Sequence, residues 1–169
     1  AFPVKVDQFT ARAEYAGGVV RPYEEQHRWG SHDYLCANRW VDVGNRHFGV
    51  TLAPHHAPIV HFGAIRYNEF STDYRPASSH LYSYAWSNRM DGLATLCPDD
   101  MNTRLAYSFT SHASDWDAGA TTRFGWSVAS PLVARQLPPG QRGTRPAGAA
   151  SFLSVDAPNV HLPVLKESA

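Results

Sequence analysis

The sequence is poor in cysteine, carries no excess of either charge and contains no long apolar run. Among its 169 residues are two cysteines, 15 basic and 15 acidic residues, so the formal net charge is zero. Proteins that bind nucleic acid or an anionic membrane surface through charge need a basic excess, so we expect neither partner.

No apolar stretch approaches the roughly 20 residues that a membrane-crossing helix requires. The first residues also lack the basic start and the apolar stretch of a signal peptide. We therefore expect a soluble protein and leave its compartment open, with the cytoplasm slightly favoured.

Cys36 and Cys97 could form one disulfide or stay free, and a single pair does not define a disulfide scaffold. Their neighbours Leu35 and Leu96 make both surroundings moderately apolar. We favour two buried free thiols, which behave as small hydrophobic side chains.

Helical periodicity is also missing, because no segment sustains an apolar period of 3.6 residues beyond two turns. We expect at most one helical turn at 115–120, with an aspartate as its N-cap. Hydrophobic residues make up 43% of the chain, and 12 glycines and 12 prolines are spread along it. This composition favours one domain over 1–169. Its Pro- and Gly-rich segment 137–149 is expected to be an exposed flexible loop.

Short segments rich in β-branched or aromatic residues, each bounded by turn-forming residues, predict strands. The segment 41–50 is typical of strand, turn and strand, and its Gly44-Asn45 pair tolerates the positive φ of a tight turn. Many strands and few helices predict a mainly β protein built as an antiparallel β-sandwich or a larger folded-over sandwich. The predicted strands are 39–43, 48–52, 59–67, 80–87, 104–112, 121–128, 150–154 and 159–165.

The nine histidines do not form a metal-binding pattern. His55 and His56 are adjacent, so on a strand they would point to opposite faces. A tight zinc site needs about four converging ligands, and no carboxylate stands at ligand spacing beside them. We expect solvated or hydrogen-bonded histidines and no intrinsic metal site.

A self-contained catalytic set is not indicated either. Glycosidases place two carboxyl groups roughly 5 to 10 Å apart across the scissile bond, but turns and helix caps account for the aspartates that cluster here. Ser111 and His112 would point to opposite faces of a strand, and no Gly-x-Ser-x-Gly elbow is present. We therefore predict no catalytic residue in this chain. The clustered aspartates are Asp91, Asp99, Asp100, Asp115 and Asp117.

The best candidates to face a ligand follow the predicted strand 80–87. Arg89 offers a rigid donor fork, Asn88 both a donor and an acceptor, and Asp91 an acceptor. With Trp86 as a stacking surface, this set suits the vicinal hydroxyl groups of a sugar. It equally suits the solvated end of a hairpin. The tryptophans within apolar strands, Trp40 and Trp126, are expected in the core.

Three ordered blocks of residues carry a resemblance to a known family. The first block is Val20-Arg21-Pro22, Arg39-Trp40-Val41-Asp42-Val43 and Phe48-Gly49-Val50, and the second is His61-Phe62-Gly63 with Ser78-Ser79-His80-Leu81-Tyr82-Ser83-Tyr84 and Asn88. The third is Tyr107-Ser108-Phe109-Thr110-Ser111-His112, Arg123-Phe124-Gly125-Trp126, Pro131-Leu132 and the run from Phe152 to Val160. In this order they resemble the C-terminal β-domain of α-mannosidases of glycoside hydrolase family 38.

The resemblance implies a super-sandwich of the galactose-mutarotase type with few short helices. Such enzymes carry the aspartate nucleophile and the zinc ligands in an N-terminal barrel, outside the β-region. It therefore implies that this chain packs on that catalytic domain, helps enclose a mannoside substrate and is inactive alone. The parent enzyme would be a retaining α-mannosidase-type glycosidase. At the loop 87–92 the family usually shows an Asn-Asn-aromatic-Trp pattern, of which only Asn88 fits here.

Two other functions remain open on the residues alone. The chain could be an independent carbohydrate-binding β-sandwich module that uses exposed tryptophan, or a stand-alone hydrolase or lyase that uses the aspartate cluster. A broad apolar patch would favour the docked domain. A wet groove lined by aromatic side chains would favour the binding module, and carboxyl groups with raised pKa values in a pocket would favour the enzyme.

Overall fold

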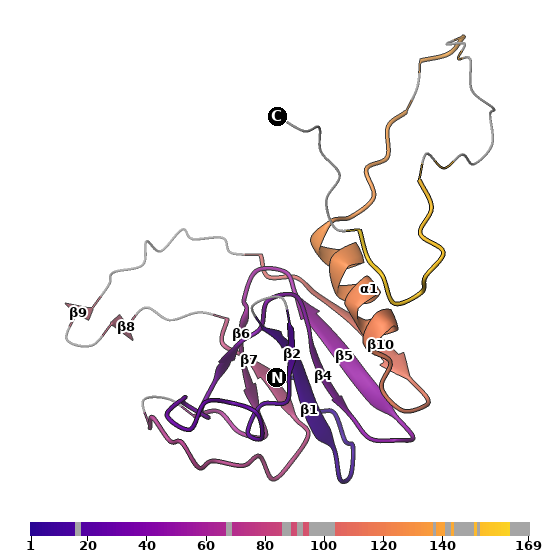
Figure 1. Cartoon of the computed structure of the whole chain (residues 1–169). Coiled ribbons are helices and arrows are strands. Elements are labelled where there is room, and N and C mark those ends of the chain that lie inside the picture. Colours follow the sequence, from indigo (N-terminus) through magenta and orange to yellow (C-terminus); the bar gives the residue numbers. More distant parts are fainter. Residues whose placement is uncertain are drawn as a thin grey trace.

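A computed structural model describes residues 1–15, 18–66, 69–85, 104–136, 138–140, 143, 151 and 153–162, together with the backbone of 89–90 and 93–94. This part of the chain is mainly antiparallel sheet with one helix (Figure 1), so the predicted mainly β class is confirmed. The strands are β1 (Thr10–Tyr15), β2 (Gly18–Val20), β3 (Leu35–Cys36), β4 (Val41–Gly44), β5 (Gly49–Pro54), β6 (Ile59–Phe62), β7 (Leu81–Ser83), β8 (Arg89–Met90), β9 (Leu93–Ala94) and β10 (Tyr107–His112), and the helix is α1 (Ala118–Ala129).

Two sheets enclose the core in a sandwich-like arrangement. The larger sheet has the order β10-β5-β4-β1-β2 and the smaller one the order β3-β6-β7, while β8 and β9 pair with each other. Apolar side chains alternate along these strands, so each sheet turns one apolar face inward. The buried cluster takes Ala11, Ala13, Val41, Val43 and Leu52 from the larger sheet and Leu35, Val60, Phe62 and Leu81 from the smaller one.

The predicted strand–turn–strand at 41–50 is confirmed as the β4–β5 hairpin, in which Gly44 lies opposite Gly49. The predicted positive φ at Gly44 and Asn45 is wrong, because neither residue adopts it. Instead, the two glycines make room for the His112 ring: a Cβ at Gly49 would lie 2.2 Å from His112 Nε2. Close approach of a side chain, rather than turn conformation, requires glycine here.

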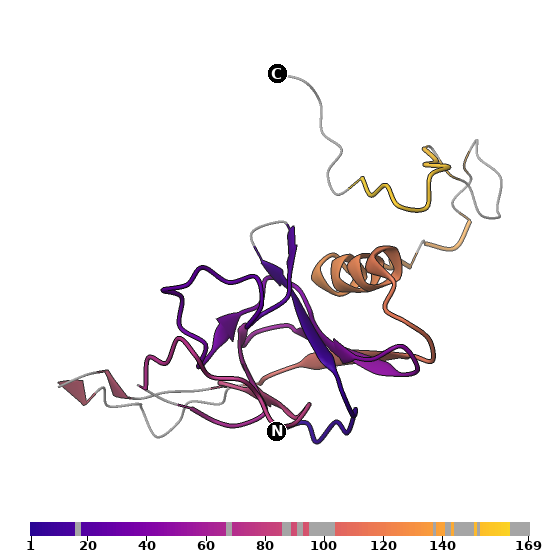
Figure 2. The same ribbon diagram turned by 60° about the horizontal axis from the view of Figure 1, so that its bottom comes forward.

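The strand predicted at 121–128 is wrong, because this segment forms most of α1. The helix is also longer than the single turn expected at 115–120. An aspartate caps it as expected: the Asp117 side chain accepts the N–H of Ala120 at 3.0 Å. Gly125 then lets the helix approach the fully buried Trp40. Figure 2 shows α1 lying along the larger sheet near β5 and β10. Capping and packing thus override the β propensity of the segment.

The other strand predictions are confirmed only in part. β6 ends at Phe62 and β10 begins at Tyr107, so both are shorter than predicted. The described residues of the predicted strands 150–154 and 159–165 lie in no strand. The predicted loop 137–149 falls largely outside the described residues.

Of the tryptophan and cysteine side chains predicted to be buried, only some are buried in the structure. Trp40 is buried as predicted, whereas Trp126 is only partly buried. The guanidinium of Arg39 stacks 3.7 Å from the Trp126 ring centre. Cys36 is free but exposed, which corrects the expected burial: Leu35 faces the core, so the next residue on the strand faces solvent. Cys97 lies outside the described residues.

In the described part of the chain, we find no helix with the length and apolar character needed to cross a membrane.

We expect Gly125→Ala to lower the free energy of unfolding by about 1 to 3 kcal/mol, because its Cβ would overpack the helix–sheet contact. That Cβ would lie 2.4 Å from Trp40 Cδ1. In the helical control Gly119→Ala, the Cβ would lie 3.2 Å from Asp117 Oδ1, 3.3 Å from a terminal nitrogen of Arg123 and 3.5 Å from the Pro158 carbonyl oxygen, all much farther than the contact at Gly125. This control should be neutral or stabilising by up to about 1 kcal/mol. Urea denaturation of both variants checks this, and equal effects would contradict the packing described.

Candidate functional site

The ligand-facing residues predicted from the sequence remain a prediction. Trp86, Asn88 and Asp91 lie outside the described residues. Arg89 has a described backbone, in β8 opposite Ala94, but its side chain is outside the described part.

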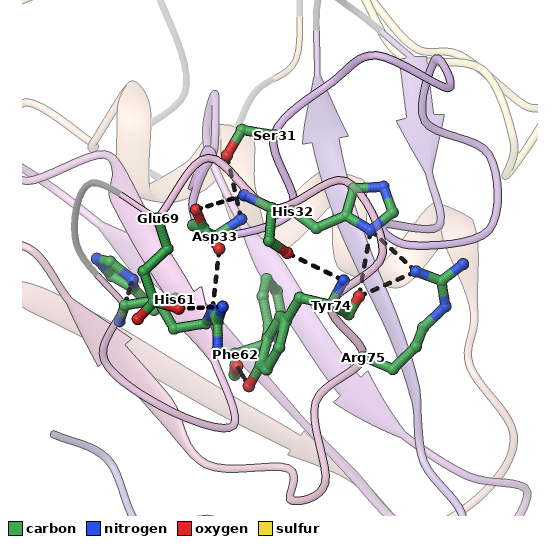
Figure 3. Close-up of polar contacts among 10 residues, drawn as sticks. Ser31, His32, Asp33, His61, Phe62, Glu69, Tyr74 and Arg75 are labelled. Atoms are coloured by element: carbon green, nitrogen blue, oxygen red, sulfur yellow. Dashed lines mark hydrogen bonds and ion pairs between the residues drawn. The ribbon is translucent and has the colours of Figure 1, made fainter.

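An ion pair between a buried carboxylate and a partly buried arginine joins two loops beside the smaller sheet (Figure 3). Asp33 is 1% exposed, and its Oδ1 accepts a hydrogen bond from Arg66 Nε at 2.9 Å. Its Oδ2 accepts the backbone N–H of Ser71 at 3.0 Å. The Arg66 guanidinium also lies 4.4 Å from the centre of the Tyr74 ring and pairs with Glu69. We call this arrangement, which ties the loop 31–34 to the loop 63–75, the loop clamp.

Asp33 is an ionised structural acceptor and not a proton donor. Burial opposes its ionisation, but hydrogen bonds from Arg66 and from the Ser71 backbone outweigh it and hold the pKa of Asp33 below its usual value of 3.8. Both carboxylate oxygens are occupied at neutral pH. The loop clamp therefore fixes geometry and offers no acid–base chemistry.

Additional hydrogen bonds extend the loop clamp. The His32 N–H donates to the Ser71 carbonyl at 2.7 Å. The His32 ring Nδ1 lies 3.1 Å from the Tyr74 carbonyl oxygen and 2.9 Å from a terminal nitrogen of Arg75. The Tyr74 hydroxyl donates to the Phe62 carbonyl at 3.0 Å, which anchors the second loop to β6. Figure 3 shows these side chains converging between the two loops.

His61 is held in its neutral form beneath the loop clamp. It is 2% exposed, and its Nδ1 accepts the Arg66 N–H at 3.4 Å. The proton of the neutral ring is therefore on Nε2, which is buried without a hydrogen-bond partner among the described residues. Burial lowers the pKa of His61, while the nearby Asp33 opposes this shift. The Tyr34 ring centre lies 6.2 Å from that of His61.

Large apolar side chains project into solvent from the two clamped loops and from the turn before them. Trp29 is 71%, Ile65 69%, Phe70 64% and Tyr34 42% exposed. Phe70 also has a left-handed backbone, with φ of +49°, which costs on the order of 1 kcal/mol and persists only where its surroundings enforce it. We call these four residues the loop face.

A second polar cluster crosses the outer face of the larger sheet. Arg12 lies opposite Asp42, and Asp42 lies opposite Thr51, in adjacent strands. Asp42 is fully buried and contacts Thr51 Oγ1 at 2.8 Å, His112 Nε2 at 3.2 Å and Arg12 at 3.7 Å. Burial raises the pKa of Asp42, and these three polar partners oppose that rise.

This second cluster resembles a catalytic Asp–His pair but cannot act as one. His112 Nδ1 contacts the Ser114 carbonyl oxygen at 2.8 Å, so both ring nitrogens are already engaged. Trp116, which leads into α1, lies 4.8 Å from the Arg12 guanidinium and covers it. A general base must reach the proton that it abstracts. We therefore assign this cluster to the attachment of α1.

Sequence reasoning missed Asp33 and Arg66, because 33 residues separate them and neither stands in a motif. The histidines as a group were expected to be solvated or hydrogen-bonded, and His61 Nδ1 does accept a hydrogen bond. Among the described residues, no three His, Cys, Asp or Glu side chains gather as a metal site would require.

Comparison with known proteins gives no match: no family model, no curated protein and no solved structure matches this chain. The function must therefore be argued from the residues and the geometry.

We expect Asp33→Ala to lower the free energy of unfolding by about 3 kcal/mol, because it leaves the partly buried Arg66 without its main partner. The control Glu69→Gln removes the exposed partner of the same arginine. It should cost less than about 1 kcal/mol. Chemical denaturation at pH 7 measures both, and a loss in Asp33→Ala no larger than in the control would contradict the role of the loop clamp.

Stability should fall as the pH drops below 6.5 through His61. The folded state holds the pKa of His61 below the usual histidine value of 6.5, so the unfolded chain takes up the proton first and protonation favours unfolding. The contribution is complete above pH 6.5 and is lost as the pH approaches the lowered pKa. An NMR titration of the His61 ring should place its pKa below 6.5, and a value above 6.5 would contradict the neutral buried ring.

Proposed function

We propose that this chain is a non-catalytic accessory β-domain that docks through the loop face on the catalytic domain of an α-mannosidase-like glycoside hydrolase and helps enclose the sugar. The loop face carries the proposal. Three of its apolar side chains, Tyr34, Ile65 and Phe70, are exposed on loops that the Asp33–Arg66 ion pair holds in place, and Trp29 is exposed on the turn before them. An apolar surface of this kind marks an interaction site.

The polar clusters support a non-catalytic role. In the described part of the chain, Asp33 has both oxygens bonded, Asp42 is sealed from solvent and His112 has both nitrogens engaged. A glycosidase needs two carboxyl groups that reach the scissile bond, and these aspartates do not reach a ligand. The reaction would then take place on the partner domain.

The zinc ion that the resemblance implies would belong to that partner. The described residues offer no converging set of three donors, and a tight zinc site needs about four. Zinc in the catalytic domain would assist nucleophilic displacement at the anomeric carbon. The role of this chain would be to exclude water from the bound sugar and to restrict the sugar's movement, through the apolar loop face.

The segments that follow α1 supply a second apolar surface. Leu132 and Val133 are 102% and 94% exposed relative to an extended reference. Four further aliphatic side chains are at least 45% exposed: Leu153, Val155, Val160 and Leu162. Such exposure in two separate regions favours a domain that is covered by a partner.

The isolated 169-residue chain should not hydrolyse a chromogenic α-mannoside, even with added zinc, because its described residues present no acid–base pair that could reach a ligand. The assay compares the chain with the same chain carrying Asp91→Asn or Asp115→Asn. Turnover that disappears in either variant would contradict the proposal and favour a stand-alone enzyme.

Docking is tested with the polypeptide encoded immediately upstream, expressed separately. Replacing Trp29 and Phe70 by serine should weaken its binding to this chain by about 100-fold, since two buried aromatic anchors are worth roughly 3 kcal/mol or more together. The control Phe48→Ser removes an aromatic side chain that is 42% exposed on the β4–β5 turn. Calorimetry measures the affinities. Equal affinity of the double variant and the control would remove the loop face from the interface.

One observation favours the second candidate, an independent carbohydrate-binding module. The exposed Trp29 ring has the Arg28 guanidinium 4.7 Å from its centre, and a flat ring with an adjacent donor is suited to stack on a sugar. Retention of the isolated chain on a mannan column, lost in Trp29→Ala, would favour this function over docking.

A further inference from the structure

A groove separate from the loop face runs between the N-terminal segment and the loop before β7. Its volume is about 660 Å³, and its walls come from segments 4–11, 22–24 and 75–80. Ligand sites in proteins commonly enclose about 300 to 1,000 Å³. The groove is thus large enough for a small organic molecule.

Hydrogen bonds far apart in sequence hold the walls together. Ser79 Oγ accepts the Val6 N–H and donates to the Val4 carbonyl, both at 2.8 Å. Gln8 and Tyr23, on opposite segments, both have left-handed backbones, with φ of +50° and +74°. Left-handed non-glycine residues are costly and often occur at binding sites. The groove is therefore built by tertiary contacts rather than left between loose loops.

Two cations line the groove without a carboxylate partner. Lys5 and Arg75 form no ion pair in the described part of the chain. One terminal nitrogen of Arg75 contacts both the Tyr74 carbonyl oxygen and His32 Nδ1, and the N–H groups on its other two guanidinium nitrogens remain available. The acidic Glu24 is paired with Arg21 at 2.9 Å and does not neutralise them. The positive charge in the groove is therefore free to meet an anion.

Polar groups that suit hydroxyl groups lie in the same walls. Burial raises the pKa of the Tyr23 phenol far above its usual value of 10, so the group stays a neutral donor. The residue is only 7% exposed, and its ring packs edge-on against His32, Phe62 and Tyr74. The Asp7 carboxylate also lines the groove without an ion pair and can accept from a hydroxyl. Asp7 repels a bare anion, which favours a ligand whose charge and hydroxyl groups lie at different ends.

The geometry points to a binding site for a hydroxyl-bearing organic anion, a sugar acid or a sugar phosphate, in the groove between segments 4–11, 22–24 and 75–80. Lys5 and Arg75 would hold the carboxylate or phosphate, and Tyr23 and Asp7 would hold hydroxyl groups. This site goes beyond the docking function and does not depend on it, because it uses no residue of the loop face.

Calorimetric titration of the 169-residue chain with glucuronate, glucose 6-phosphate, glucose and inorganic phosphate tests the site. We expect binding of glucuronate, of glucose 6-phosphate or of both. Which of them binds shows whether the site takes a carboxylate or a phosphate group. Glucose and inorganic phosphate should bind at least about tenfold more weakly, since each lacks one half of the recognised chemistry and a charge-assisted hydrogen bond is worth about 1.5 to 3 kcal/mol. Failure of both sugar anions to bind, or equal binding of glucose, would overturn the proposal.

Variants locate the binding in the groove. Lys5→Gln and Arg75→Gln should each weaken binding about tenfold or more, and Lys5→Gln leaves the hydrogen bonds of the loop clamp untouched. The control Arg135→Gln removes one positive charge from an exposed residue after α1. It should change the affinity less than twofold. If Lys5→Gln binds like the control, the groove is not the site.

Discussion

The hydrogen-bonded ion pair between Asp33 and Arg66 is the interaction on which the proposed docking surface depends. It connects residues 33 positions apart at a distance of 2.9 Å, with the carboxylate almost fully buried. Removing a carboxylate from water is costly, and the pairing with Arg66 together with hydrogen bonds from the backbone of Ser71 and Phe70 offsets that cost. The pair therefore exists in one arrangement of the two loops, and that arrangement carries Tyr34, Ile65 and Phe70 outward.

The molecule uses buried polar groups in two different ways. On the larger sheet, Asp42, Thr51 and His112 lie in one polar cluster beneath Trp116 and help to fix α1. At the loop clamp, the same kind of chemistry holds loops instead of a helix. In both places the polar side chains contact one another rather than a ligand, and the side chains that project from the clamped loops are apolar. This division supports a docking domain more than an enzyme.

The sequence allowed correct predictions where a structure depends on a local pattern of residues. It did not where the structure depends on contacts between residues far apart in the chain. Alternating apolar residues and turn residues were enough to predict the β4–β5 hairpin and the mainly β class. The segment 121–128 contains β-forming residues, and only the Asp117 cap and the contact of Gly125 with Trp40 make it a helix. Asp33 and Arg66 have no local pattern that pairs them. Their ion pair forms only when the fold brings the two loops together.

Amide hydrogen exchange of the isolated chain tests the central claim most directly. The N–H groups of His32 and Ser71 lie in loops but donate to the Ser71 carbonyl and the Asp33 carboxylate. A fixed loop pair predicts protection of both comparable to that of β6, whereas freely moving loops exchange with free energies near zero. Slow exchange at both positions, lost in Asp33→Ala, is the result that we expect. Exchange at the rate of an unstructured peptide would contradict a preformed loop face.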